Sequence, residues 1–137
     1  MSYALTATVE QPYEQTVAKV REALAEQGFG ILTEIDIRAT LREKLDVDVS
    51  PQIILGACRP PLAHAALQAE PSIGLLLPCN VVVRALDDST TLVEAVDPEL
   101  MVELTGNAEL RAVADDATNR LGLALDSLDP RRAQRKE

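Results

Sequence analysis

The sequence predicts an α+β fold with two layers, in which helices cover mainly one face of a mixed β-sheet. Segments with the two-residue alternation of strands occur between segments with the three-to-four-residue spacing of helices, in the order β-α-β-α-β-α-β-β-α-α. A polar turn separates the fourth and fifth strand segments, which is typical of an antiparallel hairpin. The chain has 137 residues and no internal repeat or linker, so we expect a single domain over residues 2–128.

The first strand is expected over residues 2–10, where apolar and polar side chains alternate. A helix then begins near Pro12, which is tolerated in a first helical turn because its missing N–H would have no partner there. Its apolar residues recur at the spacing of one helical stripe. Gly28 ends this helix, since glycine readily adopts the left-handed conformation common after a helix.

A second strand is expected over residues 29–36, and Asp36 is a suitable N-cap for the short helix that follows. That helix places Ile37, Leu41 and Leu45 at i, i+4 and i+8, which is one face of a helix. Residues 46–50 are polar and predict a turn.

The third strand, residues 52–58, is apolar on both faces and is therefore expected near the centre of the sheet. Pro60 and Pro61 begin a third helix, which ends before Pro71 because the residue preceding a proline avoids the helical region. Residues 72–78 form an apolar connector whose glycine and proline argue against a long regular element.

Residues 79–86 and 90–96 are two apolar, β-branched runs joined by a polar turn, so we expect a hairpin. A short helix follows Asp97, and a long final helix is expected from Ala108 to about Leu128. The charged residues 129–137 are predicted to form a disordered tail.

Composition excludes several functions. Aromatic residues make up 2% of the chain and tryptophan is absent, so an aromatic stacking platform for bases is not expected. The formal net charge is −9, and residues 1–130 alone carry nine basic against 21 acidic residues. A body this acidic repels phosphate backbones, so we expect no nucleic-acid partner.

The expected location is the reducing cytoplasm. Two cysteines are too few for a secreted disulfide framework. The first residues lack the basic and apolar regions of a signal peptide, and no apolar run approaches the length of a membrane span. We therefore expect no membrane partner.

Cys58, His64 and Cys79 are the chain's thiols and its one imidazole, and they are the residues most able to carry chemistry. One interpretation is that both thiols are small core residues and that His64 is a surface residue. The other is a redox or soft-metal site, in which the start of the third helix favours the thiolate of Cys58. The spacing matches no standard zinc motif, and the paired aspartates of the chain are expected on solvated surfaces.

The two thiols can share a site in one arrangement of their strands. Cys58 closes the third strand and Cys79 opens the fourth. Antiparallel pairing of these strands would place both residues at one edge of the sheet, whereas parallel pairing would separate them by about 20 Å. We therefore predict antiparallel pairing and a pocket formed by Cys58, Cys79 and the adjacent Asn80, with His64 as a further candidate.

Three motifs in order resemble one family. They are GFGILTEID at residues 28–36, GACRPPLAHAAL at 56–67 and IGLLLPCNVVV at 73–83, supported by VDP at 96–98 and TGN at 105–107. Over nearly the whole chain the sequence resembles the bacterial and archaeal family called domain of unknown function 302. The resemblance implies a two-layer α/β homodimer and supplies no reaction.

The chain departs from that family's pattern at two positions. Arg59 occupies a position where the family usually has asparagine, and Asp46 one where a glycine often ends the second helix.

Two functions remain open on the sequence. The first is a non-enzymatic ligand-binding or interaction module that acts as a homodimer, with a sheet face or the apolar Leu75–Leu77 segment covered by the second copy. The second is a thiol-dependent redox or soft-metal-handling protein that uses Cys58 and Cys79. Neither a cofactor nor catalytic residues can be named from the sequence, and a small molecule or a soft metal ion is the expected ligand class.

Overall fold

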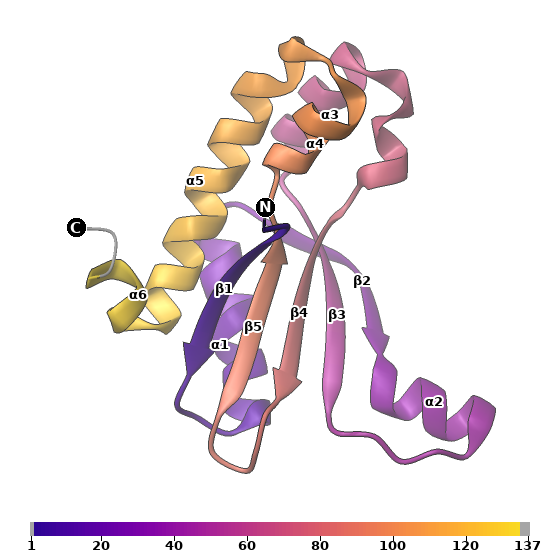
Figure 1. Ribbon diagram of the computed structural model, residues 1–137, viewed down its shortest axis with the longest axis vertical. Coiled ribbons are helices and arrows are strands. Elements are labelled where there is room, and N and C mark those ends of the chain that lie inside the picture. The colour runs from indigo at the N-terminus through magenta and orange to yellow at the C-terminus, as the bar shows by residue number, and fades with distance from the viewer. Residues whose placement is uncertain (1, 135–137) are drawn as a thin grey trace.

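The computed structural model describes residues 2–134 and consists of a β-sheet with helices packed on one face (Figure 1). The strands within these residues are β1 (Ala4–Val9), β2 (Gly30–Asp36), β3 (Gln52–Cys58), β4 (Cys79–Ala85) and β5 (Thr91–Val96). The α-helices are α1 (Tyr13–Glu26), α2 (Ile37–Leu45), α3 (Pro60–Ala69), α4 (Glu99–Thr105), α5 (Arg111–Leu128) and α6 (Pro130–Gln134). Two 3₁₀ helices, η1 (Pro71–Leu76) and η2 (Ala108–Leu110), complete the elements.

The predicted α+β class and the one-sided helical layer are confirmed, but the sheet is antiparallel rather than mixed. Its strand order is β1-β5-β4-β3-β2, and each neighbouring pair among the described strands is antiparallel. The early β-α-β alternation suggested parallel neighbours. It does not produce them because α1 connects β1 to β2, which lie at opposite edges of the sheet.

Local signals for the element ends are confirmed. Gly28 has a φ of +84° directly after α1, as expected for the residue that stops a helix. The side chain of Asp36 accepts a hydrogen bond of 2.9 Å from the backbone N–H of Ala39 and so caps α2. The predicted single final helix is instead η2 followed by α5.

The main core lies between the sheet and two helices, α1 and α5. Its buried residues include Leu55, Val81, Val83 and Val93 from the central strands, which face helical residues such as Leu121. A second, smaller core lies beyond the end of the sheet, among α3, η1, α4 and α5 (Figure 1). It is formed by Ala66, Ile73, Met101, Leu110, Val113 and Ala114.

The C-terminal segment differs from the predicted disordered tail over residues 129–134. Asp129 is only 2% exposed and accepts a hydrogen bond of 3.1 Å from the N–H of Arg131, in the first turn of α6. Arg132 donates hydrogen bonds to the carbonyl oxygens of Thr6 and Gly122, both at 3.0 Å, and pairs with Asp126. These contacts hold α6 against β1 and α5, and charge composition alone does not reveal them. Residues 135–137 lie outside the described residues.

No helix within residues 2–134 combines the length and the apolar content that crossing a membrane requires.

Candidate functional site

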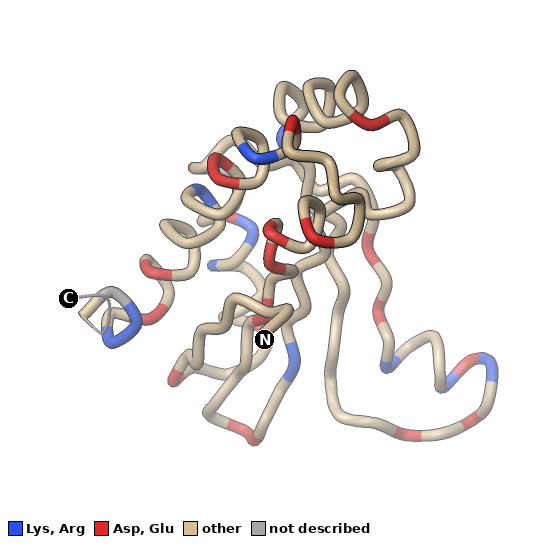
Figure 2. Tube along the Cα trace, turned by 45° about the horizontal axis from the view of Figure 1, so that its top comes forward, with Lys and Arg blue, Asp and Glu red and all other residues tan. Residues whose placement is uncertain are grey.

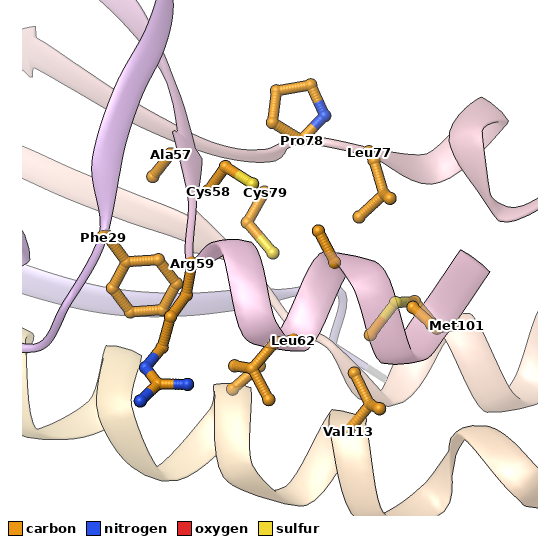
Figure 3. Close-up of a pocket in the computed structure, with 13 residues that line it drawn as sticks. Phe29, Ala57, Cys58, Arg59, Leu62, Leu77, Pro78, Cys79, Met101 and Val113 are labelled. Carbon is orange, nitrogen blue, oxygen red and sulfur yellow. The ribbon is translucent and has the colours of Figure 1, made fainter. Parts of the chain in front are cut away.

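Cys58 and Cys79 lie at the same end of two neighbouring strands, β3 and β4. Strands β3 and β4 pair antiparallel, with Ala57 directly opposite Cys79. This register confirms the predicted strand direction, and both cysteines line one pocket (Figure 3).

The pocket is narrow and apolar. Its walls come from the ends of β3 and β4, from Phe29 just before β2, and from three helices through Leu62, Met101 and Val113 (Figure 3). The free space inside is about 20 Å³, which holds about one water molecule. A larger ligand therefore requires the walls to move.

Burial changes the chemistry of one thiol. It raises the pKa of Cys79 from 9.0 to about 11, because the charged thiolate loses its solvation among apolar side chains. The nearby Cys58 thiol raises the pKa of Cys79 further by charge repulsion. At neutral pH Cys79 is therefore protonated and a weak nucleophile.

Alkylation tests this property of Cys79. In a Cys58→Ser variant, which keeps burial as the larger cause and removes the Cys58 charge, we expect iodoacetamide to react with Cys79 at pH 8 more than about tenfold more slowly than with a thiol whose pKa is 9. The rate should rise about tenfold per pH unit to a pH well above 9. The same variant in urea is the control and should titrate near 9. An apparent pKa of 9 or lower in the folded variant would contradict this assignment.

The start of α3 does not supply the amide groups that were expected to favour a thiolate at Cys58. Its first two residues, Pro60 and Pro61, have no N–H. The next two amides, of Leu62 and Ala63, both donate to the Arg59 carbonyl oxygen at 3.0 and 3.1 Å. The helix terminus therefore presents no free N–H from these residues.

Asn80 and His64 do not join the cysteines at this pocket. Asn80 lies on the opposite face of the sheet, in a shallow depression that Tyr3 and Glu94 also line. His64 is exposed on α3. Alternation along β4 explains the separation of Asn80, because consecutive residues of a strand point to opposite faces. Among the described residues, no group of three or more histidine, cysteine, aspartate or glutamate residues is arranged to hold a metal ion.

Arg59 forms a wall of the pocket that the sequence did not predict. Its side chain passes over Gly28, where an added Cβ would lie 3.1 Å from the Arg59 Nε atom. The guanidinium group lies between Phe29 and α5 (Figure 3). The Nε atom is buried without a hydrogen-bond partner within the described residues. The sequence signal for this wall was the arginine at position 59, where the resembled family usually has asparagine.

Gly56 keeps the strands near the pocket in close contact. The side chain of Thr33 crosses directly over it, at a register shift in the pairing of β2 with β3. An added Cβ at Gly56 would overlap Thr33 Oγ1 and lie 2.8 Å from the Pro78 ring. Glycine at this position therefore allows the Thr33 and Pro78 side chains to approach the backbone of β3 closely.

A second hollow, larger and polar, lies at the other end of the sheet. Its volume is about 420 Å³, and Tyr13, Arg38, Asp87 and Asp88 are among its lining residues. The sequence did not reveal it, because its walls come from segments that are far apart along the chain. The aspartate pair had been assigned to a solvated turn, and Asp87 does accept a 2.9 Å hydrogen bond from the N–H of Ser89 within that turn.

Among the residues that the structure describes, no helix covers the sheet face opposite α1 and α5, here called the open face (Figure 1). Five residues that are paired across neighbouring strands form a row through the middle of this face. They are Thr6, Glu94, Val82, Ile54 and Ile35. Arg84, in the next row, pairs with Glu94 at 3.4 Å. The open face is thus a partly apolar surface in which these two charges neutralise each other.

Residues 36–51, here called the arm, extend beyond the end of β2 and project away from the sheet (Figure 1). The arm contains α2, which has no buried residue. It carries charges of both signs (Figure 2), and Arg38 and Arg42 pair with Asp48 and Asp46 on the arm itself. The expected Leu75–Leu77 patch is smaller than predicted. Leu75 is 87% exposed, whereas Leu76 and Leu77 pack against the second core.

These features define a small α+β domain with a five-stranded antiparallel sheet and a thiol-lined apolar pocket within the described residues. The chain belongs to the family described as domain of unknown function DUF302, whose model matches residues 5–128. A crystal structure of an uncharacterized conserved DUF302 protein from Bacillus stearothermophilus is similar to it. That protein is 29% identical, covers 93% of this chain over 99% of its own, and superposes with a TM-score of 0.85. A search of curated proteins found no match.

Proposed function

We propose that this chain is a non-enzymatic ligand-binding or interaction module that acts as a homodimer. The observation that carries the proposal is that, within residues 2–134, no helix covers the open face and α2 has no buried residue. Its acidic composition favours neutral or cationic ligands. The proposal places the protein in the reducing cytoplasm, where its two free cysteines would stay reduced.

The arm is the stronger part of this argument. A nine-residue helix is marginal in water, because helix nucleation is unfavourable and most helical stability in proteins comes from packing of an apolar face. The apolar face of α2 consists of Ile37, Leu41 and Leu45, and Leu45 is 66% exposed. A second copy of the chain supplies the missing contacts.

Light scattering tests the homodimer. At micromolar concentration we expect a molar mass about twice the 14.8 kDa of one chain. A mass near 14.8 kDa across the micromolar range would refute the proposal.

The alternative is a thiol-dependent redox or soft-metal-handling protein. It is favoured by one observation, the shared pocket of Cys58 and Cys79. Two thiolates are ligands that soft metal ions prefer, and the small free volume suits a single ion. The protonated state of Cys79 and the apolar walls favour the first function instead.

Purified protein distinguishes the two functions. Bound metal by elemental analysis, a metal–thiolate absorbance band or rapid titration of both thiols would support the thiol-dependent function. A metal-free protein with slowly reacting thiols would support the interaction module.

A further inference from the structure

We infer that the dimer forms by reciprocal exchange of arms, in which α2 of each copy packs across the open face of the other. This inference rests on the proposed homodimer and specifies the surfaces that form it. One chain carries both halves of a helix-on-sheet contact: within residues 2–134, the apolar side chains of α2 are half-buried or exposed, and no helix covers the open face. A twofold axis places each half on its counterpart, which closes the assembly at two copies.

The open face has the composition of such a contact. Val82, Ile54 and Ile35 lie side by side across three neighbouring strands, and Ile35 is 46% exposed. The apolar stripe of α2 matches this row in character. Helix α1 makes an equivalent contact on the other face, where Val20, Ala23 and Leu24 join the core with the strand residues.

Electrostatics allow two acidic chains to meet at this surface. The net charge of the chain is −9, which opposes self-association through most of its surface. On the open face the charged residues Arg84 and Glu94 pair with each other. The arm likewise pairs Arg42 with Asp46 and Arg38 with Asp48. The two surfaces are therefore nearly neutral patches on an acidic molecule.

The size of the contact also requires the arm. A stable dimer buries about 800 Å² on each copy. Strands of this length at about 4.8 Å spacing make a face of roughly 20 by 20 Å, or about half of that area. A nine-residue helix adds about 130 Å² from each arm, and projecting side chains increase both values. The exchange reaches that size only where the two open faces also meet around the arms, because one nine-residue helix covers about 130 Å² of the face.

Charge substitutions on the two surfaces test the exchange. Leu41→Lys alters the arm and Val82→Glu alters the open face. Each variant alone is expected to weaken self-association by about 100-fold or more, because an unpaired charge becomes buried in both contacts. An equimolar mixture should form heterodimers more tightly than either variant forms homodimers. In the mixture one contact is unmodified and the other pairs the new lysine with the new glutamate.

The controls separate this inference from the proposed function. Leu104→Lys changes a residue of α4 that is 67% exposed and should leave the dissociation constant within about twofold. If Val82→Glu does not fold by circular dichroism, Thr6→Glu places the same charge at the exposed end of the same row. A wild-type dimer that both surface charges leave intact would overturn arm exchange while the homodimer stands. A wild-type monomer would overturn both.

Discussion

Replacing Gly56 with alanine is expected to lower the free energy of unfolding by about 2–3 kcal/mol, the upper part of the range for overpacking a tight interior. The new Cβ would overlap Thr33 Oγ1 and approach the Pro78 ring to 2.8 Å. Rotation of Thr33 can relieve the first contact. The proline ring cannot rotate away, so β3 must shift from its neighbours. Urea unfolding followed by circular dichroism measures the change.

Gly74→Ala is the matched control for this substitution. Gly74 also lies within a short regular element, but an added Cβ there meets no atom within 4 Å. Its effect should stay within about 0.5 kcal/mol. Thr33→Ala combined with Gly56→Ala should recover part of the loss, because it removes one of the two clashes. Equal effects of the two glycine substitutions would show that close approach at Gly56 does not matter for stability.

Local chemistry explains why most elements could be predicted. Asp36 caps α2, Gly28 ends α1 and Pro60 begins α3, and each of these depends on residues within one helical turn. The strand bearing Gly56 was assigned in full, because its apolar character on both faces indicates a central position.

Properties that depend on distant residues were not predictable in the same way. No local pattern states that β1 pairs with β5, so the alternation of elements suggested a mixed sheet. The hydrogen bonds of Arg132 to Thr6 and Gly122 join α6 to β1 and α5. They order residues 130–134, which the charged composition predicts to be disordered.

The candidate site was predicted in part for the same reason. The predicted antiparallel pairing of β3 and β4 is confirmed, and it brings Cys58 and Cys79 to the same end of these strands. Asn80 was grouped with them by sequence proximity, although alternation places it on the open face. The walls of the pocket, including Met101 and Val113, come from helices whose packing no local motif specifies.

Hydrogen exchange of the α2 amides is expected to depend strongly on whether the protein is dimeric. In a single copy, the amides of α2 belong to a nine-residue helix with no buried side chain, which should open readily. In the dimer the same amides are covered by the second copy. We expect their hydrogen exchange to be slowed by about 1000-fold or more when the protein is dimeric, since protection then includes the free energy of dissociation.

Hydrogen–deuterium exchange of α2, measured at several protein concentrations, tests whether a second copy covers the arm. The amides of Val83 and Val93 in the central strands serve as the internal reference, since both residues are buried within one chain. Protection of residues 41–45 is expected to fall on dilution and to be lost in the Leu41→Lys variant, while the reference amides stay protected. Exchange of α2 that is fast at every concentration, or slow to the same degree in monomer and dimer, would contradict this expectation.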